Sequence, residues 1–177
     1  MNVSLIRSQT SLQESILELL NRQMAMEAHS SSTYLAMAGW CYHQGLVGCG
    51  YYLKEQSGEE REHMLKIFDY VTDAGGLPVS PEVNSIDARF EGLRDIFVKA
   101  LELEIEVTES FNNMTAHCHE IKDFQTAKFL QWFLDEQREE EQNARRLIEL
   151  FDLIGVENGG LYKIDKEVAK LRNTEIA

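Results

Sequence analysis

Apolar side chains recur along most of this chain at steps of three and four residues, the period of an amphipathic α-helix. Glycines follow several of the periodic segments, as expected where a helix ends. The pattern predicts four long helices and one short helix, at about residues 12–44, 47–74, 92–119, 124–154 and 162–172. The sequence therefore predicts an all-α protein with a single domain over residues 1–177.

Several helix ends carry recognisable signals. In the stretch TSLQE, Ser11 is expected to cap the first helix, with Glu14 completing a capping box. Asp123 is expected to cap the fourth helix in the same way. Gly45 and Gly75 are expected to end the first and second helices.

The segment between the second and third helices determines the topology. It runs from Gly75 to Glu91 and holds both prolines, so it is predicted to be a loop. A helix of about 28 residues is ~42 Å long. The loop from Gly75 to Glu91 has 17 residues and reaches ~56 Å when it is extended. The loop can therefore span the bundle and let the third helix run parallel to the second. This predicts a four-helix bundle with one long crossover.

The apolar stripe of each long helix is interrupted near its midpoint by a glutamate: Glu27, Glu60, Glu104 and Glu140. Helix midpoints share one level of a bundle whatever the helix directions, so these carboxylates are expected to form one layer in the core. His63 follows Glu60 by three residues and shares its helical face.

A buried layer of this kind favours metal. Burying even one unpaired charge costs several kcal/mol, and the four stripes carry no lysine or arginine. A single glutamate on a stripe can be solvated, but four at one level would be balanced by two divalent cations. The alternative, protonation of several glutamates, would cost stability for no gain. Carboxylates with one imidazole and no thiolate suit iron or manganese better than structural zinc.

Tyr34 lies seven residues after Glu27 on the same helical face, about two turns away. It could donate a hydrogen bond or an electron to the metal site. A core tyrosine with a satisfied hydroxyl is an equally good interpretation.

Composition and charge narrow the function classes. Of the 177 residues, 44% are hydrophobic, which is typical of a globular protein. The formal net charge of -13 argues against nucleic acid as a partner and is compatible with cation handling, although solubility explains it equally well. No segment has the apolar length of a membrane span or of a signal peptide, so we expect a soluble protein without a membrane partner. The three cysteines, Cys41, Cys49 and Cys118, have no metal-ligand spacing and indicate reduced thiols in the cytoplasm.

Over almost its whole length, the chain resembles the non-haem ferritins of prokaryotes. The matching stretches are NRQMAMEAHSSSTYLAM, EEREHM, ELE ending at Glu104, FLQWFLDEQREEE and GGLYKIDKE. The resemblance implies a ferritin-like bundle with a short fifth helix, assembled into a hollow shell of twenty-four subunits. It also implies a ferroxidase that oxidises Fe(II) with dioxygen, or with hydrogen peroxide, and stores the product as ferric mineral.

The resemblance further implies roles for individual residues. Glu27, Glu60 and His63 resemble the ligands of the first ferroxidase iron, with Glu60 bridging to the second iron. Glu104 and Glu140 resemble ligands of the second iron, and the residue close by is Gln137. Each subunit would thus bind a pair of irons.

A third iron site is also implied. Glu59, Glu136 and Glu139 stand one residue away from core positions, about 100° around their helices. They match the additional site of prokaryotic ferritins, which neighbours the iron pair on its inner side. A solvated helix face is the competing interpretation of these three residues.

Haem is not expected. Bacterioferritins place a haem-ligating methionine immediately after the bridging glutamate, where this chain has Arg61. They also have a second histidine in the fourth helix, where this chain has Glu139 and Glu140. The mini-ferritins fit poorly too, because they lack the fifth helix.

Two other functions are compatible with a helical bundle. A di-iron oxidase or peroxidase of the rubrerythrin type would turn over a small molecule without storing metal. Such proteins usually carry an additional cysteine site, and the sequence has no CxxC pair. A helical interaction module would bury leucine, not glutamate, at the helix midpoints.

Overall fold

A computed structural model describes residues 9–171 of the chain, and within that range its regular structure is entirely helical. Four long helices form the bundle, namely α1 (Glu14–His43), α2 (Val47–Asp73), α3 (Leu93–Ile121) and α4 (Phe124–Ile154). A short 3-10 turn, η1 (Glu157–Gly159), leads into α5 (Gly160–Leu171). The predicted all-α fold is confirmed. The last residue of the predicted fifth helix, at position 172, lies outside the described residues.

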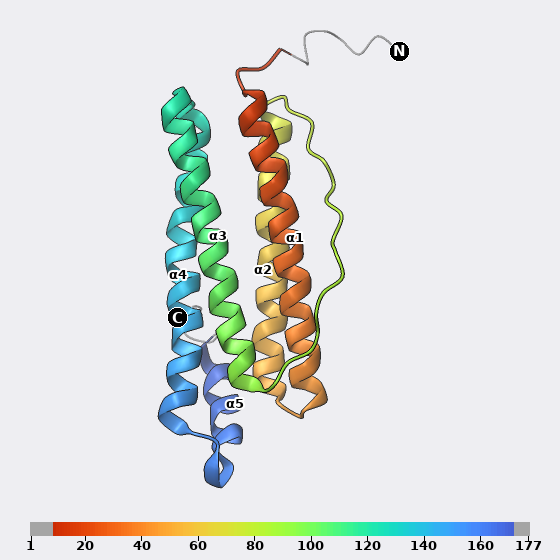
Figure 1. The fold of residues 1–177 in the computed structure, drawn as a ribbon, viewed down its shortest axis with the longest axis vertical. Helices are drawn as coiled ribbons and strands as arrows, with labels where there is room; N and C mark the ends of the chain where they lie inside the picture. The colour runs from red at the N-terminus through yellow and green to blue at the C-terminus, as the bar shows by residue number, and fades with distance from the viewer. Residues whose placement is uncertain (1–8, 172–177) are drawn as a thin grey trace.

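The loop over residues 74–92 runs along the outside of the bundle from one end to the other (Figure 1). It joins the α1–α2 hairpin to the α3–α4 hairpin, so that α2 and α3 run parallel. The side chain of Asn21 on α1 accepts a hydrogen bond of 2.8 Å from the backbone N–H of Val79 in the loop. The predicted crossover is therefore present and is fastened to the first hairpin.

The predicted signals at three helix ends are found in the structure. The side chain of Asp123 caps α4, because its Oδ1 accepts the backbone N–H of Thr126 at 3.0 Å. Gly45 and Gly75 follow α1 and α2 with φ of +78° and +82°. Glycine adopts this left-handed conformation without steric cost, and so allows the chain to leave the helix sharply.

The predicted cap of α1 is wrong. The helix begins at Glu14 with Gln13 at the cap position, and no side chain caps it. The hydroxyl of Thr10 instead accepts the backbone N–H of Leu12 at 3.0 Å and donates to the carbonyl of Ala74. The helix thus begins two residues later than the capping box predicts, and the Thr10 contact ties the preceding segment to the end of α2.

Helix α5 packs across the beginning of α2. Asp165 of α5 is buried, and its Oδ1 accepts the backbone N–H of Cys49 at 2.8 Å, in the first turn of α2. This bond satisfies one of the N–H groups that a helix start leaves unpaired. A Cβ at Gly48 would lie 2.2 Å from the carbonyl oxygen of Asp165, so this close approach requires glycine.

The three cysteines are buried free thiols, in agreement with the prediction of reduced cysteines. Burial raises the pKa of Cys41 to about 12 and that of Cys118 to about 11. These thiols are therefore protonated, and unreactive as nucleophiles, near neutral pH.

The core consists of two hydrophobic clusters along the length of the bundle. One packs α5 and the neighbouring ends of α1–α4, and includes Tyr34, Phe97 and Ile164. The other fills the opposite half and includes Leu20, Phe111 and Phe133. The interior therefore divides into two apolar halves, and buried polar side chains occupy the level between them.

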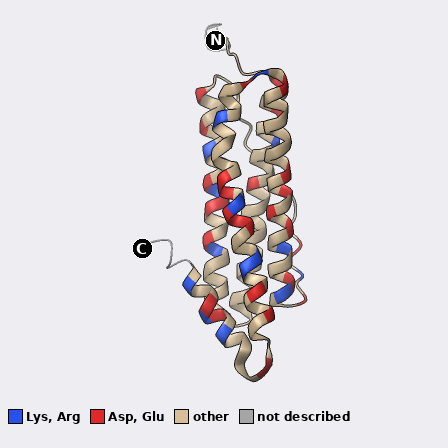
Figure 2. Cartoon of the chain, turned by 90° about the vertical axis from the view of Figure 1, so that its left-hand side faces the viewer, with Lys and Arg blue, Asp and Glu red and all other residues tan. Residues whose placement is uncertain are grey.

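Charged residues of both signs are spread along the whole length of the bundle, with acidic residues in the majority (Figure 2). None of the helices in the described part of the chain combines the length and apolar character that a membrane crossing requires.

The cap of α4 leads to a test of the fold. Asp123→Ala removes the acceptor for the N–H of Thr126, and should lower the free energy of unfolding by about 1–2 kcal/mol. The thermal midpoint should fall by roughly 2–4 °C for each kcal/mol. Asp135→Ala, which removes an exposed aspartate of the same helix, serves as the control. Equal midpoints for the two variants would contradict the cap.

Candidate metal centre

Three of the four predicted core glutamates meet at the middle of the bundle. Glu27 comes from α1, Glu60 from α2 and Glu104 from α3. Their exposed fractions are 0%, 1% and 1%, respectively. The helical repeat places each on the inward face, where the sequence would otherwise have an apolar residue. The predicted carboxylate layer is present at these three positions.

Glu27, Glu60 and His63 form a compact group of ligand atoms. Nδ1 of His63 lies 3.7 Å from Oε2 of Glu60 and 4.0 Å from Oε2 of Glu27. One such atom from each residue lies within 4.8 Å of the other two. These three atoms are buried and have no hydrogen-bond partner among the described residues. Unpaired buried polar atoms are rare, and a divalent cation held by two carboxylates and one imidazole would satisfy all three.

Both oxygens of Glu104 already accept hydrogen bonds. The hydroxyl of Tyr34 donates to Oε1, and Nε2 of Gln137 donates to Oε2 at 3.0 Å. Tyr34 and Gln137 are themselves buried. Tyr34 was predicted either to donate a hydrogen bond or an electron to the site or to be a core tyrosine with a satisfied hydroxyl. In the structure its buried hydroxyl donates a hydrogen bond to Glu104. Oε1 of Gln137 has no hydrogen-bond partner in the described part of the chain, and is a further oxygen that a metal could use.

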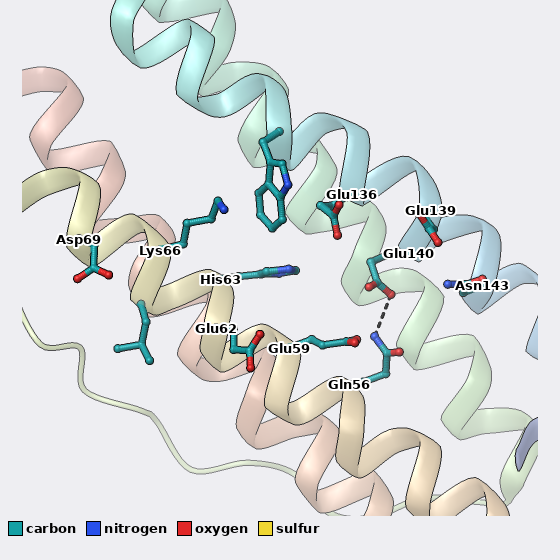
Figure 3. A pocket seen from close by; sticks show the side chains of 12 residues that line it. Gln56, Glu59, Glu62, His63, Lys66, Asp69, Glu136, Glu139, Glu140 and Asn143 are labelled. Atoms are coloured by element: carbon teal, nitrogen blue, oxygen red, sulfur yellow. Dashed lines mark hydrogen bonds between the residues drawn. The ribbon is translucent and has the colours of Figure 1, made fainter. Parts of the chain in front are cut away.

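Glu140 is placed differently from the other three glutamates, and the expectation that it is buried in the core is wrong. It is half-buried, and its Oε2 accepts a hydrogen bond of 2.9 Å from Nε2 of Gln56 (Figure 3). The buried residue of α4 at this level is Gln137, with an exposed fraction of 1%. A step of three residues turns the helix by about 300°. Glu140 therefore lies about 60° around from Gln137, toward the space between α2 and α4.

A cavity of about 540 Å³ opens beside His63 between α2 and α4 (Figure 3). The predicted third-site residues Glu59, Glu136 and Glu139 all line it, together with Glu140. Glu59 and Glu136 are half-buried and Glu139 is exposed. The structure brings these carboxylates to one cavity, and their role as iron ligands stays a prediction.

Lys66 and Trp132, which were not among the predicted site residues, also line this cavity. Nζ of Lys66 lies 3.8 Å from the centroid of the Trp132 ring, a cation–π contact. The Trp132 ring in turn meets the His63 ring edge to face, with centroids 5.5 Å apart. The position of Lys66, three residues after His63 on the same helical face, was the available signal.

Burial disfavours the ionised form of all three core glutamates. It raises the pKa of Glu27 well above its ordinary value, and the negative charge of Glu60 raises it further. Burial likewise raises the pKa of Glu60, with the charge of Glu104 as the next cause. Burial also raises the pKa of Glu104, against the hydrogen bonds from Tyr34 and Gln137, which lower it. Without metal, the layer therefore favours bound protons.

Comparisons with known proteins agree with this geometry. A family model described as the ferritin-like domain matches residues 17–154. A bacterial non-heme ferritin of Escherichia coli O6:H1 is 36% identical over 160 residues, which cover 90% of this chain and 97% of the relative. A probable bacterial non-heme ferritin-like protein of Haemophilus influenzae is 33% identical, with the same coverage of 90% and 97%. An open pore ferritin from the archaeon Archaeoglobus fulgidus has a TM-score of 0.88 and 34% identity, and covers 91% of this chain and 98% of its own.

The raised pKa values predict how the stability of the metal-free protein depends on pH. A glutamate with a raised folded-state pKa stabilises the fold fully below its unfolded value of 4.5, and this contribution is lost as the pH rises through the folded-state pKa. The melting temperature of the metal-free protein should therefore decrease as the pH is raised from about 5 to neutrality. At neutral pH, Zn(II) at 100 times its dissociation constant should raise the free energy of unfolding by about 2.7 kcal/mol.

The matched control is Glu60→Gln, which keeps the side-chain shape and removes one charge. Its pH dependence should be flatter, and Zn(II) should stabilise it less. A wild-type midpoint that does not respond to Zn(II) at neutral pH would count against a metal centre in this layer.

Proposed function

The chain belongs to the ferritin-like family, and on that premise we propose that it is an iron-storage ferroxidase. It oxidises Fe(II) with dioxygen or hydrogen peroxide at a pair of iron sites inside each subunit, and stores the ferric product in a hollow homo-oligomeric shell. The observation that carries the proposal is the group of three buried ligand atoms on Glu27, Glu60 and His63 that have no hydrogen-bond partner within residues 9–171.

The first Fe(II) binds between Glu27, Glu60 and His63. This assignment is supported by the convergence of the ligand atoms of the three residues, because binding then needs little rearrangement of side chains. The imidazole supplies the one nitrogen ligand, and the carboxylates supply negative charge to a substrate cation. The pKa of Glu60 is raised by the charges of Glu104 and Glu140, and that of Glu27 is raised by the charge of Glu60. This proximity supports its role as the bridge to the second iron.

The second Fe(II) binds at Glu104 and Glu140, with Oε1 of Gln137 as an additional donor. Here the carboxylates are engaged by Tyr34, Gln137 and Gln56. A metal must share or displace these hydrogen bonds, so the second site fills after the first. Burial, followed by the charge of Glu104, raises the pKa of Tyr34, which keeps its phenol protonated and able to donate.

A pair of irons suits the chemistry of the oxidant. Each Fe(II) gives one electron, so two irons supply the two electrons that convert dioxygen and two protons to hydrogen peroxide. Both metals must be held about 3.5–4 Å apart for this, as in other two-metal sites. Glu59, Glu136 and Glu139 offer a third place for iron, in the cavity adjoining the pair.

Storage requires assembly, and we infer a homo-oligomer of twenty-four subunits. The support is the family of the chain and the coverage of at least 95% of the ferritins to which it is similar. The Archaeoglobus fulgidus relative is described as having an open pore. A rubrerythrin-type oxidase would share the metal layer without forming a storage shell.

The storage function predicts a large, iron-retaining particle. Size-exclusion chromatography of the protein after aerobic addition of Fe(II) should give a species near twenty-four subunits that keeps iron far in excess of its binding sites. A small oligomer that oxidises Fe(II) and releases it would instead support the rubrerythrin-type alternative.

The oxidation step predicts different effects for residues at and beside the iron pair. Glu60→Ala removes the bridge and His63→Ala removes the nitrogen ligand. Each should slow Fe(II) oxidation by more than the ~10–100-fold that loss of an outer-shell partner costs. Stopped-flow absorbance at two Fe(II) per subunit measures the rate.

Two further variants serve for comparison. Glu139→Ala should leave the first rapid oxidation intact and alter only later turnover in excess Fe(II). Glu109→Ala, at an exposed position of α3, controls for the loss of one negative charge. All variants should assemble, and a wild-type rate in Glu60→Ala would disprove the di-iron assignment.

A further inference from the structure

We propose that Gln23 and Ser110, which do not themselves bind metal, are positioning residues that orient Glu27 so that its Oε2 faces the first iron. The inference rests on the proposed metal centre and adds two residues to it. It follows from a chain of two hydrogen bonds that begins on α3, passes through α1 and ends at the Glu27 carboxylate.

The last bond of the chain occupies one of the two oxygens of Glu27. Gln23 precedes Glu27 by one helical turn on the same face of α1, and its Nε2 donates to Oε1 at 2.7 Å. Both side chains are buried, with exposed fractions of 1% and 0%. With Oε1 engaged, Oε2 is the oxygen left without a hydrogen-bond partner among the described residues, 4.0 Å from Nδ1 of His63.

The first bond of the chain restrains the Gln23 amide from its other end. The hydroxyl of Ser110 on α3 donates to Oε1 of Gln23 at 2.5 Å. A reversed amide would set its carbonyl oxygen against the Glu27 carboxylate, and two acceptors in contact repel each other. Glu27 therefore sets which end of the amide faces it, and the Ser110 hydroxyl, bonded to the opposite end, restrains the Gln23 side chain across the interface between the two hairpins.

A neutral donor suits this task better than a charged one. A lysine or arginine in place of Gln23 would also hold the carboxylate, but its positive charge would cancel the negative charge that attracts the metal. Neutral amides also contact the other carboxylates of the layer, where Gln56 donates to Glu140 at 2.9 Å and Gln137 to Glu104 at 3.0 Å. Three helices thus each direct a buried amide at a different carboxylate.

Titration of the metal-free protein with Co(II), followed by its visible absorbance, tests the proposal without relying on oxidation. His63→Ala first identifies the binding step that belongs to Glu27, Glu60 and His63. Gln23→Leu should weaken that step by about 10–100-fold, the usual cost of losing an outer-shell partner of a metal ligand. It should leave the second Co(II) step close to that of the wild-type protein.

Variants at Ser110 separate positioning from packing. Ser110→Ala should weaken the first step about fivefold, the effect of one net hydrogen bond, whereas Ser110→Thr keeps the hydroxyl and should retain wild-type affinity. Thr115→Val is the control, because it removes a buried hydroxyl of α3 that has no hydrogen-bond partner in the described part of the chain.

The outcomes distinguish this inference from the function on which it rests. A wild-type first step in both Gln23→Leu and Ser110→Ala would overturn the positioning role and leave the metal centre in place. Equal weakening of both steps in Gln23→Leu would also overturn it, because that pattern indicates general loss of structure. If the wild-type protein shows no Co(II) step that depends on His63, the metal centre itself is wrong.

Discussion

The main physical constraint on this structure is that three carboxylates are buried in the middle of a helical bundle, where their ionised form is unfavourable. Water solvates a carboxylate far better than a protein interior does, so burial alone works against Glu27, Glu60 and Glu104 in their ionised form. Two hydrophobic clusters, one on each side of the layer, supply the packing that keeps the helices together. The polar layer can therefore serve metal, because the ends of the bundle provide its stability.

The candidate metal centre also lies at the interface between the two hairpins. The α1–α2 hairpin carries Glu27, Glu60 and His63, and the α3–α4 hairpin carries Glu104 and Glu140. Hydrogen bonds cross between the hairpins at this level from Tyr34, Gln56 and Ser110. The first hairpin presents open ligand atoms and the second presents engaged ones, so the two proposed iron sites are chemically unequal. The long crossover joins the hairpins at opposite ends and leaves the layer between them free of chain connections.

Much of this arrangement could be predicted from the sequence, because helical periodicity depends on local geometry alone. A glutamate that replaces an apolar residue in a regular stripe signals burial, and this was sufficient for α1, α2 and α3. It failed on α4, where Gln137 and Glu140 are three residues apart and either could have faced the core. The capping box predicted at Ser11 failed as well, because α1 begins at Glu14 without a side-chain cap. The Thr10–Ala74 contact just before it joins segments far apart in the sequence and could not be predicted from a local motif. The pairing of Ser110 with the side-chain amide of Gln23 could not be predicted from periodicity, because that hydrogen bond depends on how α1 and α3 pack.

The choice of amides around the layer follows from two opposing requirements. Each carboxylate must be held in one orientation, since a loose ligand binds metal weakly. It must also keep its negative charge available, which excludes the lysine and arginine partners that pair most buried carboxylates. A glutamine N–H meets both requirements, because it donates a directed hydrogen bond and carries no net charge. The cost is that the metal-free layer stays short of positive charge, and under the proposed function the same shortage favours the binding of cations.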